Sequence, residues 1–121
     1  MTVRKVLCVD DSAAELDLIR KIVLSANLNV VSATNGKDAI QCAQTELPDL
    51  IFLDIVMSGM DGFAVIRELQ KDPATKDIPV VFVSSKNQKA DQAWAKMQGA
   101  KGFVPKPISE EAILEVIRKF E

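Results

Sequence analysis

Short apolar runs alternate along the chain with segments whose apolar residues recur every three or four positions. A short, mostly apolar run predicts a strand buried on both faces, whereas the wider spacing predicts an amphipathic helix. The runs predict strands at 3–9, 30–33, 50–53, 80–83 and 103–104. The wider spacing predicts helices over 12–23, 38–46, 63–71, 90–97 and 109–120. The order is therefore a strand followed by a helix, repeated five times.

This alternation predicts an α/β fold. Strands that are apolar on both faces, each followed by a helix, require a parallel sheet with helices on both sides. Five such units predict a three-layer, doubly wound sheet, because a closed barrel of this type needs eight units. We expect one domain over residues 1–121, since this length leaves no room for a second core. In such sheets, ligands bind at the carboxyl ends of the strands.

Two local patterns add detail to the helices. Ser12 followed three residues later by Glu15 predicts a reciprocal capping box at the start of the first helix. Trp94 shares an apolar stripe with Ala90 and Met97, which favours packing in the core over contact with a partner.

Composition and charge exclude several classes of function. The chain has 121 residues, of which 26% are charged, and a formal net charge of −2, which argues against a nucleic-acid partner. Charges or turns interrupt every apolar run, and the first nine residues lead into Asp10 without a cleavage site. We therefore expect neither a membrane span nor a secretion signal, and a cytoplasmic location. Cys8 and Cys42 lack the spacing of metal ligands, so both are interpreted as small buried hydrophobic residues. Histidine is absent, which excludes Ser-His-Asp and Cys-His nucleophiles.

Polar residues follow four of the predicted strands directly at their carboxyl ends. They are Asp10 and Asp11, Asp54, Ser84 and Ser85, and Lys106. Two carboxylates about 4 Å apart repel each other by roughly 4 kcal/mol at an effective dielectric constant of 20. One lysine cannot neutralise three of them, so the cluster favours a hard divalent cation such as Mg²⁺. A carboxylate nucleophile, a hydroxyl, an ammonium and a cation are the groups that phosphoryl transfer requires.

Four segments in this order carry a resemblance to a known family. They are Val9-Asp10-Asp11-Ser12, Leu53-Asp54 with Met57-Ser58-Gly59-Met60-Asp61-Gly62, Val83-Ser84-Ser85, and Lys106-Pro107. Spread over essentially the whole chain, they resemble the CheY-like receiver domains of bacterial response regulators. The resemblance implies a flavodoxin-like (βα)5 fold with strand order 2-1-3-4-5. It also implies a phosphorelay switch that is not an enzyme, beyond catalysing its own phosphorylation and dephosphorylation.

The resemblance assigns roles to the polar cluster. It implies that Asp54 is the phospho-acceptor and that Asp11 and Asp54 bind Mg²⁺ directly. Asp10 acts on the metal mainly through water, and the backbone carbonyl of Val56 is a further ligand. Ser84, rather than Ser85, binds one phosphoryl oxygen. 

Further positions are assigned by the same resemblance. Lys106 pairs with a second phosphoryl oxygen, and the Lys106–Pro107 bond is expected to be cis, which directs the lysine inward. Ser84 and Phe103 act as the switch pair. Val56 and Lys86, two places after Asp54 and Ser84, tune the rate at which the acyl phosphate is hydrolysed.

Two departures from the family pattern are visible. Ser58 stands where the family usually has proline, which leaves that loop less restrained. Phe103 lacks the hydroxyl of the commoner tyrosine, so a partner contact through that oxygen is absent.

The resemblance also implies partners. With no histidine in the chain, the phosphoryl donor is a separate sensor histidine kinase. A downstream protein effector reads the surface formed by the fourth helix, the fifth strand and the fifth helix. We expect a monomer or a weak, phosphorylation-dependent dimer. The segment 86–100 resembles receivers of type IV pilus twitching motility and related chemotaxis-like pathways.

Two other classes of protein compete with this interpretation. A pseudo-receiver that is never phosphorylated would need an incomplete acidic set, whereas all its members are present here. A phosphatase with an aspartyl-phosphate intermediate, or a flavin-binding protein of the same fold, would need a substrate-sized insert or a glycine-rich phosphate loop. No such insert follows any predicted strand, and no such loop follows the first strand, where Asp10 and Asp11 would repel a cofactor phosphate.

Overall fold

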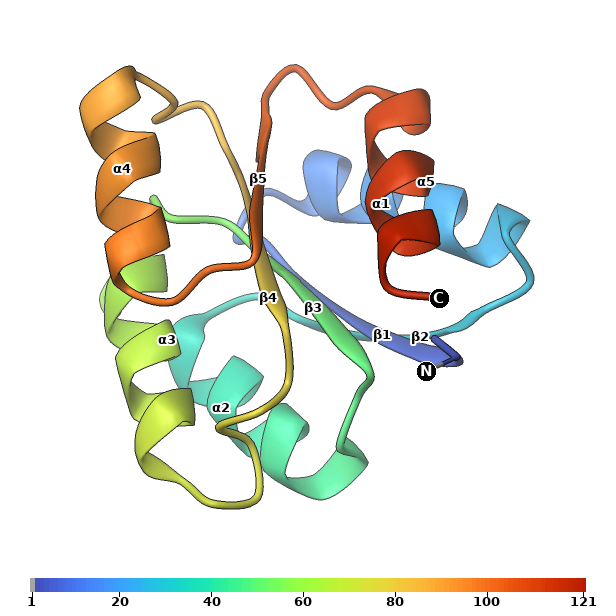
Figure 1. The fold of residues 1–121 in the computed structure, drawn as a ribbon. Coiled ribbons are helices and arrows are strands. Elements are labelled where there is room, and N and C mark those ends of the chain that lie inside the picture. Colours follow the sequence, from blue (N-terminus) through green and yellow to red (C-terminus); the bar gives the residue numbers. More distant parts are fainter. Residues whose placement is uncertain (1) are drawn as a thin grey trace.

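The computed structural model describes residues 2–121, and over this range five parallel strands form one sheet with helices on both faces (Figure 1). The strand order is β2-β1-β3-β4-β5, which confirms the expected flavodoxin-like arrangement. The strands are β1 (Lys5–Val9), β2 (Asn29–Ala33), β3 (Leu50–Leu53), β4 (Val80–Ser84) and β5 (Gly102–Pro105).

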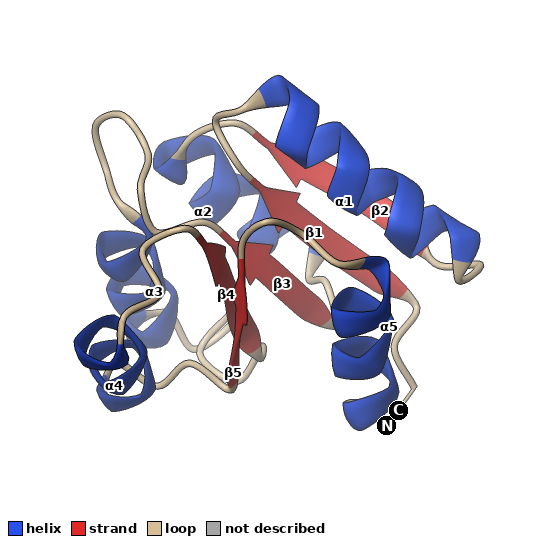
Figure 2. Ribbon diagram, turned by 90° about the horizontal axis from the view of Figure 1, so that it is seen from above, coloured by secondary structure: helices blue, strands red, loops and turns tan. Residues whose placement is uncertain are grey.

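The helices divide into two layers. Seen from above, α1 and α5 lie on one side of the sheet, and α2, α3 and α4 lie on the other (Figure 2). Their bounds are α1 (Ala13–Ser25), α2 (Gly36–Glu46), α3 (Gly62–Lys71), α4 (Lys89–Met97) and α5 (Glu110–Lys119). Each helix returns the chain to the next parallel strand, so all strands end at the same edge of the sheet.

Side chains alternate between two cores along each strand. Leu7 and Val9 of β1 face the layer of α2 and α3, whereas Val6 and Cys8 face the layer of α1 and α5. Burial on both faces explains why the central strands are continuous apolar runs. The first strand was predicted from residue 3 but begins at Lys5, and Val3 is nevertheless buried.

Most of the helices begin at a residue whose side chain caps the first turn. Ser12, Asn35, Asp61 and Ser109 each accept a hydrogen bond from the backbone N–H three residues later. The predicted capping box at α1 is only half formed. Ser12 accepts from the Glu15 N–H at 3.4 Å, but the Glu15 carboxylate turns away from the cap and pairs with Lys106. An ammonium is the stronger partner for a carboxylate than a neutral N–H.

The interpretation of Trp94 as a core residue is wrong. Its side chain is 46% exposed, Met97 is 75% exposed, and the buried position of α4 is Ala95. The indole lies against the outer edge of α3, where its ring centroid is 6.4 Å from that of Phe63. Ala95 supplies the contact of α4 with the core, and the larger residues of the stripe lie at the margin. Cys8 is buried as expected, whereas Cys42 is only half-buried.

None of the helices in residues 2–121 combines the length and the apolar character that crossing a lipid bilayer requires.

Candidate functional site

Three aspartates meet at the carboxyl edge of the sheet. Asp10 follows the last residue of β1 and Asp54 follows the last residue of β3, and these strands pair with Val9 opposite Leu53. The register therefore places Asp10 beside Asp54, and Asp11 follows in the same loop. One carboxylate oxygen from each of the three residues lies within 4.8 Å of the others.

Backbone N–H groups orient these carboxylates. The Ser12 N–H donates to Asp10 Oδ1 at 2.9 Å, and the Val56 N–H donates to Asp54 Oδ1 at 3.3 Å. The Ser58 N–H donates to Asp11 Oδ2 at 3.1 Å, so the loop after β3 also holds the loop after β1. Asp10 and Asp54 are buried, whereas Asp11 is exposed.

Lys106 brings a positive charge into this cluster from the end of β5. Its ammonium lies 2.9 Å from Asp10 Oδ2 and 3.1 Å from Asp54 Oδ2, and it also pairs with the carboxylate of Glu15. The Lys106–Pro107 peptide bond is cis. Burial opposes the charged form of Lys106, but hydrogen bonds to the three carboxylates outweigh it and raise the pKa of the ammonium above its ordinary value.

The charges in the cluster are not balanced. Burial raises the pKa of Asp10 above its ordinary value, the nearby charge of Asp54 raises it further, and hydrogen bonds from Lys106 and Ser12 act in the opposite direction. Three carboxylate oxygens that converge within 4.8 Å, two of them from buried residues, form a hard, anionic donor set. This set fits a small divalent cation such as Mg²⁺, which would neutralise the remaining negative charge.

Ser84 lies at the end of β4, between the acidic cluster and β5. It is fully buried, whereas Ser85 is exposed. Its hydroxyl oxygen accepts a hydrogen bond from the Lys86 N–H at 3.2 Å, and its carbonyl accepts one from the Lys106 N–H at 3.1 Å. Ser84 is thus tied to the residue that carries the ammonium.

Val56 and Lys86 follow Asp54 and Ser84 by two positions. Each is bonded through its backbone N–H to a site residue, Val56 to Asp54 and Lys86 to Ser84. The Val56 side chain is 56% exposed. The Lys86 ammonium lies 3.3 Å from Asp91 Oδ1 at the start of α4, which links the site to that helix.

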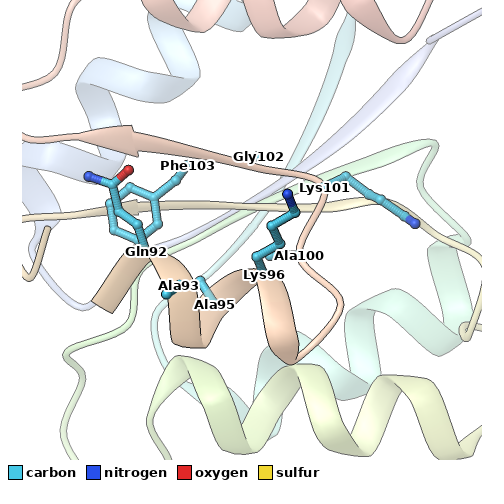
Figure 3. A pocket seen from close by; sticks show the side chains of 8 residues that line it. All are labelled: Gln92, Ala93, Ala95, Lys96, Ala100, Lys101, Gly102 and Phe103. Atoms are coloured by element: carbon cyan, nitrogen blue, oxygen red, sulfur yellow. The ribbon is translucent and has the colours of Figure 1, made fainter. Parts of the chain in front are cut away.

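Phe103 is the half-buried aromatic residue of β5. Its ring centroid lies 6.5 Å from that of Phe82, and the ring of Phe82 lies 5.4 Å from that of Phe63. Phe103 also lines a pocket of about 360 Å³ between α4 and β5 (Figure 3). Lys96 and Gln92 lie along the α4 side of this pocket. A rotation of the Phe103 ring would therefore change the shape of this surface.

Gly62 allows the loop after β3 to close over the site. A Cβ atom at this position would lie 2.4 Å from the backbone oxygen of Asp54 and 2.8 Å from Ile55 Cα. Backbone atoms cannot move away easily, so only glycine fits where α3 begins against Asp54 and Ile55. The sequence places Gly62 in a loop but does not reveal this contact.

Glu15 is the site residue that sequence reasoning missed. It was interpreted as part of a helix cap, but its carboxylate reaches Lys106 across the carboxyl edge of the sheet. Its position in the first turn of the helix that follows Asp10 and Asp11 is the only sequence signal that points to the site.

Comparison with known proteins agrees with this geometry. The model of the response regulator receiver domain family matches residues 6–118, and the chain belongs to this family. It is 40% identical over 113 residues to Protein PilH of Pseudomonas aeruginosa, a match that covers 93% of each chain. It is 36% identical over 114 residues to response regulator PleD of Caulobacter vibrioides, of which the match covers 25%. The structure of the chemotaxis protein CheY4 of Vibrio cholerae superposes with a TM-score of 0.92 at 26% identity and covers 99% of this chain and 100% of that one.

Proposed function

We propose that this receiver domain accepts a phosphoryl group on Asp54 from a sensor histidine kinase, in a Mg²⁺-dependent reaction. The observation that carries the proposal is the convergence of Asp10, Asp11 and Asp54 on one another and of Lys106 on two of them. Such a cluster supplies a nucleophile, a cation site and a counter-charge for phosphoryl oxygens within one pocket.

The chemistry assigns a task to each side chain. A carboxylate oxygen of Asp54 attacks the phosphorus of the kinase phosphohistidine, a P–O bond forms, and the P–N bond breaks. The imidazole leaves with the electron pair and takes up a proton. Asp10, Asp11, Asp54 and the Val56 carbonyl would hold Mg²⁺, with Asp10 acting mainly through water. When bound, the ion would neutralise part of the negative charge on the phosphoryl oxygens.

Ser84 and Lys106 would bind the remaining phosphoryl oxygens. The Ser84 hydroxyl, which now accepts from the Lys86 N–H, turns to donate to the phosphoryl group. Phe103 then rotates into the vacated space, which repacks the face of α4, β5 and α5. A change from 1:99 to 99:1 between two states requires about 5.5 kcal/mol of preference. Two or three charge-assisted hydrogen bonds of about 1.5–3 kcal/mol each supply it.

Hydrolysis of the acyl phosphate would be tuned by the two flanking residues. The exposed side chain of Val56 and the side chain of Lys86, which pairs with Asp91, would control the access of water to the acyl phosphate.

The wider setting is also a proposal. The chain would form one receiver domain over residues 1–121 and would act in the cytoplasm. A downstream protein would bind its α4-β5-α5 face. The chain itself would be a monomer, or a weak dimer that forms on phosphorylation. The resemblance of 86–100 to receivers of twitching motility supports a role in pilus motility or a chemotaxis-like pathway. The similarity to the chemotaxis protein CheY4 is consistent with the second of these.

The test is incubation of the chain with acetyl phosphate and Mg²⁺, followed by separation on a phosphate-affinity gel. We expect one labile modification that is lost in Asp54→Asn and in the presence of EDTA. Asp77→Asn, which changes an exposed carboxylate after α3, is the matched control and should be modified like the wild type. No modification of the wild type would favour a pseudo-receiver, and rapid turnover without a modified state would favour a phosphatase.

A further inference from the structure

The Lys106 ammonium is shared among three carboxylates, one of which lies outside the acidic cluster. Asp10 and Asp54 belong to that cluster, whereas Glu15 is in the first turn of α1. The side chain of Glu15 is 41% exposed, but its Oε2 atom, which pairs with Lys106, is buried. Glu15 thus reaches from the surface into the site, where it pairs with Lys106.

An ammonium has three N–H donors, and Lys106 donates hydrogen bonds to Asp10 and Asp54 and forms an ion pair with Glu15, so three carboxylates surround its charge. A phosphoryl oxygen that pairs with Lys106 must therefore replace one of these partners. Asp10 is almost completely buried, so its carboxylate would lose its counter-charge in the interior of the protein. Glu15 can turn into solvent, because its side chain is 41% exposed. Of the two partners that remain carboxylates when Asp54 is phosphorylated, Glu15 is therefore the one whose replacement requires less free energy.

We propose that Glu15 is a positioning residue that holds Lys106 toward α1 before phosphorylation and slows phosphoryl transfer to Asp54. This inference rests on the proposed function, because it requires that Asp54 accept a phosphoryl group. In the transfer, the Asp54 oxygen forms a P–O bond while the bond between phosphorus and the leaving group breaks. Lys106 exchanges the Glu15 carboxylate for a phosphoryl oxygen, and Glu15 moves into water.

The size of the effect follows from the exposure of Glu15. Partly exposed ion pairs are weak, which limits the expected acceleration on loss of Glu15 to about two- to fivefold. A salt bridge of this kind also weakens at high ionic strength, so the difference between the variant and the wild type should shrink as salt is added.

The experiment measures the rate of phosphorylation by acetyl phosphate at saturating Mg²⁺ for the wild type, Glu15→Gln and Glu15→Asp. We expect both variants to be faster, because glutamine loses the charge and aspartate keeps the charge but loses the reach. Asp17→Asn is the matched control: it removes a carboxylate of α1 that pairs with Lys21 at 3.0 Å, away from the site, and should leave the rate unchanged.

A second arm tests whether Glu15 acts through Lys106. In a Lys106→Gln background, Glu15→Gln should no longer accelerate the reaction. In EDTA and without a phosphodonor, the urea midpoints of the single and double variants should be non-additive, which reports the contact itself.

The outcomes separate the two proposals. A wild type that is never modified overturns the proposed function, while the urea midpoints still report whether Glu15 and Lys106 interact. A modified wild type with equal or slower Glu15 variants overturns the role of Glu15 alone. Equal acceleration with and without Lys106 also overturns it, because Glu15 would then act only through the charge of the whole pocket.

Discussion

The ammonium of Lys106 lies 3.1 Å from the Asp54 carboxylate although the two residues are 52 positions apart in the chain. This contact joins the ends of β3 and β5, which are separated in the sheet by β4. The lysine side chain must therefore reach across the end of β4, where Ser84 is buried. Any group that binds Asp54 consequently lies close to the ammonium of Lys106.

Replacement of Asp54 by asparagine should stabilise the fold in the absence of Mg²⁺. The change removes one of three crowded carboxylates, while Lys106 keeps Asp10 and Glu15 as partners. We expect the free energy of unfolding to rise by about 1 kcal/mol, as measured by urea denaturation in EDTA. A large loss of stability in this variant would show that the carboxylates do not repel each other.

Addition of Mg²⁺ should stabilise the wild type. A ligand that binds only the folded state at ten times its dissociation constant contributes about 1.4 kcal/mol to the free energy of unfolding. We expect this gain to fall sharply in Asp11→Asn, which replaces one carboxylate of the cluster by a neutral amide. Asp11 is exposed, so the substitution leaves the core unchanged. Thermal unfolding with increasing Mg²⁺ checks this result, with Ca²⁺ as a comparison ion. Equal stabilisation of both proteins would place the ion elsewhere.

The two cysteines should differ in reactivity. Burial raises the pKa of the Cys8 thiol to about 12, so at pH 9 Cys8 remains protonated and covered in the folded protein. Cys42 is only half-buried, although burial also raises its pKa. A thiol-exchange dye should therefore label Cys42 in the native protein and both cysteines in urea. In Cys42→Ser, we expect no rapid labelling of the native protein.

The same shift makes stability depend on alkaline pH. Cys8 has an ordinary pKa of 9.0 when unfolded and about 12 when folded, so between these values the folded state binds more protons. The free energy of unfolding should therefore fall as the pH rises through this window. The ammonium of Lys106 acts in the same direction, since its pKa in the folded state is also raised. Urea denaturation at a series of pH values from about 8 to about 11 measures the slope.

Gly62→Ala should destabilise the protein by about 2–3 kcal/mol, because the new methyl group would overlap backbone atoms of the acceptor loop. Gly102→Ala is the matched control. There the added Cβ lies 3.4 Å from Val81 Cγ2, an ordinary contact, so we expect a change within about 0.5 kcal/mol. Urea denaturation compares the two variants, and equal losses would contradict the proximity of α3 to Asp54.

The sheet and its acidic edge could be predicted because they depend on short-range rules. Apolar runs specify buried parallel strands, and parallel strands bring Asp10, Asp54 and Lys106 to the same edge wherever the helices lie. The direction of a single side chain depends on partners that are distant in the chain. Glu15 faces Lys106 rather than its own cap, and Trp94 lies outside the core because a small alanine occupies the buried position of α4.

The position of Trp94 has a practical consequence. It is the only tryptophan in the chain, so the intrinsic fluorescence of the protein arises from one indole beside α3 and α4. That indole touches Phe63, which packs on Phe82, the ring that neighbours Phe103. The fluorescence of Trp94 can therefore report on binding without an added label. Its emission should move to shorter wavelength when a binding protein covers the surface of α3 and α4 and excludes water from the indole.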